Sequence, residues 1–126
     1  HMRVARVPEH IDVIMDLACG AQGYMMISSV QGFGGVADAN IYGSEGTLRI
    51  SGGALYGARR GDSDLQEIAI PDTERGGWRV EDEFIGAIRG EEAITHTTFD
   101  TGVKYMEFTE AVNRSMAEGK AISIPL

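Results

Sequence analysis

Residues 32–37 carry the spacing G-x-G-x-x-A, which is typical of the loop that holds the pyrophosphate of a dinucleotide. That loop needs a helix directly after it, because the helix N-terminus binds the phosphates. Here residues 38–43 follow, and they alternate as a strand does and end in a glycine turn. The sequence therefore argues against a nucleotide site at this loop.

The other side chains with catalytic or metal-binding chemistry form no recognisable site. His10 and His96 have no Cys, Asp or Glu at the spacing of metal ligands, so we interpret both as ordinary residues and predict no metal site. No serine lies in a nucleophile elbow. The acidic runs at 81–83 and 91–92 could pose as acid–base pairs, but such runs are usually solvated faces of helices and loops. We predict no catalytic residue in this chain.

The chain has 126 residues and a formal net charge of −8, with 19 acidic and 11 basic residues. A protein that binds nucleic acid or an anionic membrane needs a basic surface, so this balance disfavours both partners. The single cysteine, Cys19, excludes an internal disulfide. No apolar run approaches the roughly 20 residues that span a bilayer, and we find no signal peptide. We therefore expect a cytoplasmic protein.

Alternating apolar residues and glycine-rich turns predict short strands linked in antiparallel or mixed order. The expected strands are residues 11–19, 24–31, 36–42, 47–51, 54–59, 65–70 and a closing strand at 120–125. The first two form a hairpin with apolar residues on both faces, so both faces should be covered. Between the third and fourth, Gly43 and Gly46 bracket a tight turn, where we expect the positive φ that glycine tolerates.

Two helices follow the strands. Helical spacing of apolar residues predicts one over Trp78–Arg89, ended by Gly90. The second begins at the N-cap Thr98 and ends at Gly119. Its apolar stripe consists of Tyr105, Phe108, Val112 and Met116. The expected fold class is α+β: an open-faced, mostly antiparallel (mixed) sheet of about six strands with helices packed on one face.

Two stretches together resemble the C-terminal domain of the glucose–fructose oxidoreductase / inositol dehydrogenase / MocA family. Residues 41–50 resemble its I-x-G-x-x-G-x-L hairpin. A second stretch resembles its final helix and strand, through Phe99-Asp100-Thr101-Gly102, Ala111, Ser115, Gly119 and Ile122-Ser123-Ile124-Pro125. The resemblance runs from about Ile11 to Pro125 and implies the same open-faced sheet. It also implies part of an NAD(P)-dependent oxidoreductase acting on a sugar, polyol or inositol.

That family keeps its dinucleotide fold, a Glu-Lys-Pro lysine and an Asp-x-x-x-His pair upstream of this region, and none of these motifs occurs here. We therefore expect residues 3–126 to be a single C-terminal domain for substrate binding and oligomerisation, without the N-terminal dinucleotide-binding domain. Residues 1–2 look like a cloning scar. NAD or NADP would bind to the missing domain, so no cofactor is expected in this chain, and the isolated chain is predicted to be inactive.

The resemblance places the loop before residue 41 near the mouth of a substrate cleft. Gln31, Phe33 and Asp38 would then contact a small sugar or polyol, while the alternative is a surface loop with one buried Phe. The open sheet face would form a homodimer or a higher oligomer. A second interpretation is a stand-alone, non-enzymatic module that binds a small ligand or only assembles.

Overall fold

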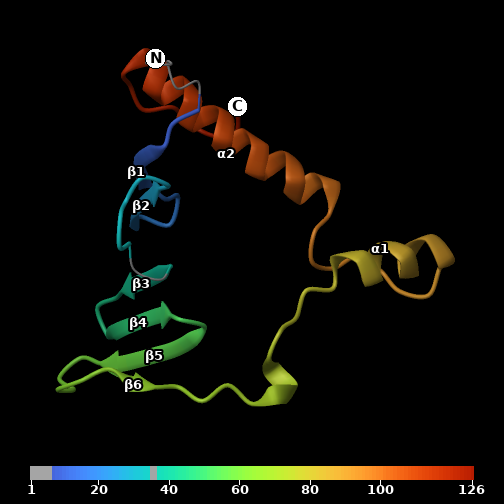
Figure 1. Cartoon of the computed structure of the whole chain (residues 1–126), viewed down its shortest axis with the longest axis horizontal. Helices are drawn as coiled ribbons and strands as arrows, with labels where there is room; N and C mark the ends of the chain where they lie inside the picture. The colour runs from blue at the N-terminus through green and yellow to red at the C-terminus, as the bar shows by residue number, and fades with distance from the viewer. Residues whose placement is uncertain (1–6, 35–36) are drawn as a thin grey trace. The chain divides into compact units, whose positions relative to one another are not determined.

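The computed structural model describes residues 7–34 and 37–126 (Figure 1). The chain forms two compact units, one up to Gly76 and one from Gly77 onward. In the described residues, the strands belong to the first unit and both α-helices belong to the second. The class is α+β, as the sequence predicts.

The first two strands form the predicted antiparallel hairpin, β1 (His10–Asp16) and β2 (Gln22–Ser28). The turn begins at Leu17, whose N–H donates to the carbonyl oxygen of Ala21 at 2.8 Å. Gly20 takes a φ of 87° within this turn, which is a conformation that glycine adopts without strain. The strand therefore ends before the predicted end at residue 19.

The two faces of the hairpin differ in polarity. Residues directly opposite in an antiparallel pair share a face, and so do residues two apart along a strand. One face is apolar, with Ile11, Val13, Met15, Met25 and Ile27. The other, here called the mixed face, combines polar and apolar side chains: His10, Asp12, Ile14, Asp16, Gln22, Tyr24, Met26 and Ser28.

The remaining strands form a second, four-stranded sheet in the order β3-β4-β5-β6, and every pairing is antiparallel. Their bounds are Asp38–Tyr42, Gly46–Ser51, Ala54–Arg59 and Gln66–Glu67. The described residues thus form six strands, in agreement with a predicted sheet of about six, but these strands divide between two sheets. The last strand is much shorter than the predicted 65–70.

The four-stranded sheet has one apolar face, which its register explains. Ile41, Leu48 and Gly57 lie opposite one another across three strands. Ile50, Leu55 and Ile68 fall on the same side by the period of two. Several of these side chains remain exposed, including Ile41, Leu48, Ile50 and Ile68. An exposed apolar face of this kind is usually buried against another surface.

The turn between β3 and β4 forms where predicted, but its glycines have another role. Gly43 donates its N–H to the carbonyl oxygen of Gly46 at 2.8 Å. Neither glycine has a positive φ, so that part of the prediction is wrong. At Gly46 a Cβ would lie 2.3 Å from the carbonyl oxygen of Ala58, so glycine is required there by the close approach of β5. Positive φ occurs instead at Gly52 and Gly53, between β4 and β5.

A short 3₁₀ helix, η1 (Asp72–Glu74), follows the sheet, and the second unit contains α1 (Val80–Arg89) and α2 (Phe99–Glu118). The α1 helix starts two residues later than predicted and ends at Gly90, which has a φ of 73°. The α2 helix has both predicted caps: Thr98 Oγ1 accepts from the N–H of Thr101 at 3.1 Å, and Gly119 is left-handed. Neither described helix is long and apolar enough to cross a bilayer.

The predicted closing strand at 120–125 is wrong, because no strand in the described residues pairs with this segment. The tail runs beside α2, and Leu126 shares an apolar hollow with Phe99, Val103 and Met106. Apolar alternation in the tail was the signal for a strand, but a strand also needs a partner for its N–H and C=O groups. The packing of the helices on one sheet face stays a prediction.

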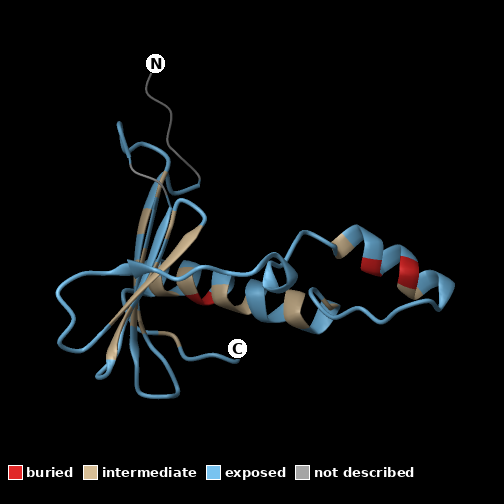
Figure 2. Cartoon of the chain, turned by 90° about the horizontal axis from the view of Figure 1, so that it is seen from below, coloured by how far each residue is buried: buried red, intermediate tan, exposed pale blue. Residues whose placement is uncertain are grey.

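Little of the described chain is buried (Figure 2). The buried positions are Glu83 and Gly86 on α1 and Ala111 on α2. Of these only Ala111 is a hydrophobic side chain, whereas Glu83 is a carboxylate with 3 % of its surface exposed. Ionised side chains are almost never buried without partners, so Glu83 must be paired with hydrogen-bond donors.

Candidate functional site

The predicted substrate residues Gln31 and Phe33 lie in the loop that follows β2. Gly34 donates its N–H to the carbonyl oxygen of Gln31 at 3.4 Å, which closes a turn around Phe33. Phe33 has a φ of 54°, an uncommon conformation for a residue with a side chain. Its ring is fully exposed, so the alternative of a buried Phe is wrong.

Asp38, the third predicted residue, is the first residue of β3 and lies opposite Ser51. Its carboxylate accepts a hydrogen bond from Arg49 at 2.6 Å. The hydroxyl of Ser51, and then Arg49, lower the pKa of Asp38, so this carboxyl stays ionised. Within the described residues no hydrogen bond joins Asp38 to Gln31 or Phe33, and residues 35–36 of the glycine-rich motif lie outside that part.

A three-residue cluster occupies the mixed face of the β1–β2 hairpin. Tyr24 donates its hydroxyl to Asp12 Oδ1 at 2.7 Å, and His10 Nε2 lies 3.0 Å from Asp12 Oδ2. The hydrogen bond from Tyr24, and then that from His10, lower the pKa of Asp12, while the same carboxylate raises the pKa of Tyr24. Asp12 thus holds the Tyr24 ring in place while most of the ring stays exposed.

The more enclosed cluster surrounds Glu83, on the first turns of α1. Glu83 Oε2 accepts from the backbone N–H of Thr95 at 2.8 Å and of His96 at 3.0 Å. Glu83 Oε1 accepts from the Thr95 hydroxyl at 2.7 Å and also contacts His96 Nδ1. The Thr95 hydroxyl and the two backbone N–H groups lower the pKa of Glu83 to about 2. This carboxylate is therefore an ionised acceptor, and it is not a general acid near neutral pH.

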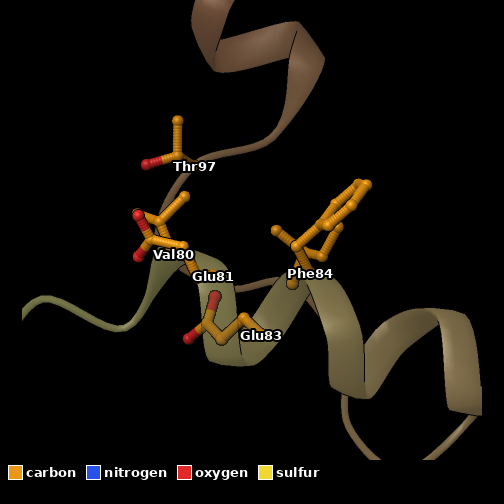
Figure 3. Close-up of a pocket in the computed structure, with 6 residues that line it drawn as sticks. Val80, Glu81, Glu83, Phe84 and Thr97 are labelled. Atoms are coloured by element: carbon orange, nitrogen blue, oxygen red, sulfur yellow. The ribbon is translucent and has the colours of Figure 1, made fainter.

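A pocket of about 190 Å³ lies beside Glu83. Figure 3 shows that α1 contributes one wall and that Thr97, from the segment after α1, lies across from it. The lining residues are Val80, Glu81, Glu83, Phe84, Ile94 and Thr97. Most of them present apolar atoms, and Glu83 has its acceptor positions occupied by Thr95 and His96. The pocket is small, and among the contacts of the described residues no hydrogen bond joins the Thr97 hydroxyl to the carboxylate of Glu81 or Glu83.

The sequence interpretation missed these two clusters for different reasons. Residues two apart on a strand share a face, but the predicted strand began at residue 11, whereas β1 begins one residue earlier and so places His10 beside Asp12. Thr95 and His96 are 12 and 13 residues from Glu83, a spacing that carries no local signal. The prediction that residues 81–83 are solvated is correct for Glu81 and Asp82 and wrong for Glu83. His96 is likewise not an isolated residue, because its ring contacts this carboxylate.

Two further features of the described chain concern nucleotide and metal binding. Residues 38–42 form β3, so a strand and not a helix follows the G-x-G-x-x-A motif, as predicted. In residues 7–34 and 37–126, no group of three His, Cys, Asp or Glu side chains could hold a metal ion.

Comparisons with protein-family models, curated proteins and solved structures found no match to this chain. The resemblance to the glucose–fructose oxidoreductase / inositol dehydrogenase / MocA family therefore stays a prediction from the residues that carry it.

Proposed function

We propose that this chain is the C-terminal, substrate-side domain of an NAD(P)-dependent oxidoreductase that acts on a sugar, polyol or inositol. The observation that best supports the proposal is the turn at 43–46. Gly46, the second glycine of the motif I-x-G-x-x-G-x-L, lies where an added Cβ would clash with the Ala58 carbonyl oxygen, so the turn requires the glycine that the motif has at this position. The capped helix that carries the second motif adds support, with Thr98 before it and Gly119 after it.

In this scheme the chain supplies one wall of the substrate cleft, and the absent dinucleotide-binding domain supplies NAD or NADP and the catalytic residues. The test is to produce residues 3–126 together with the protein segment encoded upstream and to assay NAD(P)H formation with a panel of polyols and sugars. We expect turnover by the longer protein and none by residues 3–126 alone. Absence of turnover by the longer protein, or turnover by the short one, would contradict the proposal.

Within the cleft, Gln31, Phe33 and Asp38 are the proposed substrate contacts. An exposed aromatic ring suits the apolar face of a sugar, and amide and carboxylate oxygens suit its hydroxyl groups. Phe33 fits because its ring is fully exposed on a backbone with positive φ, and such backbone outliers are common at binding sites.

Kinetics of the complete enzyme test the Phe33 contact. We expect Phe33→Ala to raise the KM for the polyol about tenfold, since burying one aromatic contact is worth roughly 1–2 kcal/mol. The matched control is Tyr42→Ala, which removes another exposed aromatic ring. An unchanged KM in Phe33→Ala, or an equal rise in both variants, would exclude Phe33 from the site.

We also propose that the protein is cytoplasmic and forms a homodimer or a higher oligomer through the open sheet face. The mixed face of the hairpin supports this proposal, because Ile14 is 81 % exposed, Tyr24 66 % and Met26 48 %. Such a patch is costly to leave in water, and the hydrogen bonds around Asp12 hold Tyr24 in one position. A two-fold interface would bury the same patch on both copies.

Light scattering of Ile14→Asp measures this assembly. We expect the wild type to be a dimer or larger at micromolar concentration and Ile14→Asp to be a monomer with an unchanged circular dichroism spectrum. The control is Ile88→Asp, on an exposed position of α1. A monomeric wild type would contradict the interface. Assembly without any NAD(P)-dependent turnover by the longer protein would favour the alternative, a non-enzymatic assembly module.

A further inference from the structure

We infer that residues 91–97 form a strap that Glu83 latches onto α1, and that this strap opens as a unit when the Glu83 carboxylate is neutralised. The inference concerns the helical unit alone and is independent of the proposed oxidoreductase function. The strap begins after Gly90, which ends α1, and it ends just before Thr98, which caps α2.

The latch consists of one carboxylate and two consecutive residues. Glu83 accepts both backbone N–H groups of Thr95 and His96 as well as the Thr95 hydroxyl. All of these groups donate to the same carboxylate. A change that removes this acceptor therefore breaks all of the hydrogen bonds together. Such charge-assisted hydrogen bonds are about twice as strong as neutral ones, and here they pair a carboxylate that is itself buried.

The second connection between the strap and α1 is weaker. Arg79 donates to Glu92 Oε2 at 2.8 Å, but both side chains are exposed, and exposed ion pairs contribute little. Glu92 also lies over Gly86, where a Cβ would come within 2.5 Å of Glu92 Cγ. This contact positions the start of the strap, while the Glu83 latch holds its end.

Opening of the strap would have two structural consequences. Ile94 and Thr97 form one wall of the pocket against Val80 and Phe84, so opening would expose that apolar surface. The latch also ends at His96, two residues before the N-cap Thr98, so opening would loosen the first turn of α2. The strap therefore controls both the pocket and the start of the longer helix.

The contacts identify the titratable and charged groups around Glu83. His96 faces it from the strap, the Arg79–Glu92 pair bridges α1 and the strap nearby, and Glu81 lines the same pocket. Protonation turns one carboxyl oxygen into an O–H donor. That oxygen then faces N–H and O–H groups that are also donors, so their hydrogen bonds to it are lost. Glu83→Gln imitates this change at neutral pH, because the amide nitrogen is a donor in place of an acceptor oxygen.

Amide hydrogen exchange of the full chain at neutral pH tests the strap. In Glu83→Gln we expect the amides of Thr95 and His96 to exchange at least about tenfold faster, together with the other amides of residues 91–97, while the middle of α2 keeps its protection. The matched control is Asp82→Asn, an exposed neighbour on the same helix, which should leave the exchange unchanged. Unchanged exchange at Thr95 and His96 in Glu83→Gln would overturn the inference.

A second variant covers the case in which Glu83→Gln unfolds both helices. Thr95→Val removes only the hydroxyl donor and leaves both backbone N–H bonds to Glu83. We expect a smaller increase in exchange, of a fewfold, confined to residues 91–97. An increase that spreads evenly through α2, or no increase at all, would show that the segment does not open as a unit.

Discussion

The carboxylate of Glu83 lies 2.8 Å from the backbone nitrogen of Thr95, so a side chain of α1 holds the backbone of the segment that leads into α2. The cap of α2 itself, Thr98, is only three residues further along the chain. The junction between the two helices is therefore held by polar groups, because the described residues offer little buried apolar surface there.

The stability of the helical unit should depend on pH, because the pKa of Glu83 is lower in the folded chain than its ordinary value. Its pKa in the folded chain is about 2, below its ordinary value of 4.5, so its contribution is complete above pH 4.5 and is lost as the pH falls toward 2. We expect the free energies of unfolding of wild type and Glu83→Gln to differ near neutral pH and to converge in acid. Helical circular dichroism during urea unfolding measures both, and a difference that is independent of pH would contradict this role.

Gly46 should tolerate no side chain, because the nearest atom to an added Cβ is a backbone oxygen of Ala58, which cannot rotate away. We expect Gly46→Ala to lower the free energy of unfolding by about 1–3 kcal/mol, as overpacking does. The matched control is Gly43→Ala, whose Cβ would make an ordinary contact at 3.5 Å and should change stability by less than about 0.5 kcal/mol. Equal effects of the two variants in urea unfolding would contradict the close approach.

The α2 helix offers two opposite changes in stability. Thr98→Ala removes the side-chain acceptor for the Thr101 N–H and should destabilise the helix by about 1 kcal/mol. Gly102→Ala adds a Cβ in open space on the same helix and should stabilise it by about 1 kcal/mol. Thermal unfolding followed by circular dichroism gives both signs, and a loss in Gly102→Ala would mean that the position packs closely against another surface.

Tyr24 should titrate above its ordinary pKa, because ionisation of its hydroxyl would break the bond to Asp12 and place two negative charges together. We expect Asp12→Asn to lower the pKa of Tyr24, while Asp16→Asn, on the same face, leaves it unchanged. Nuclear magnetic resonance of the labelled tyrosine ring during an alkaline titration measures the effect. An identical Tyr24 titration in wild type and Asp12→Asn would show that the contact is absent in solution.

Several features of this chain follow from residues that are close in sequence. The caps of α2 need only Thr98, Thr101 and Gly119, and the strands around Gly52-Gly53 need only alternation and a glycine pair. These signals act within a few residues, so the α+β class and most of the elements could be predicted. The direction of each hairpin follows from the same short turns.

Other features depend on contacts that no local pattern carries. The division of the strands into two sheets, and the missing partner of residues 120–125, depend on which backbone groups meet across long separations. The burial of Glu83 depends on Thr95 and His96 folding back onto α1. The sequence left open whether Phe33 is a buried ring of a surface loop, and in the structure its ring is exposed. Pairing and burial are set by distant residues, so only the tertiary structure decides them.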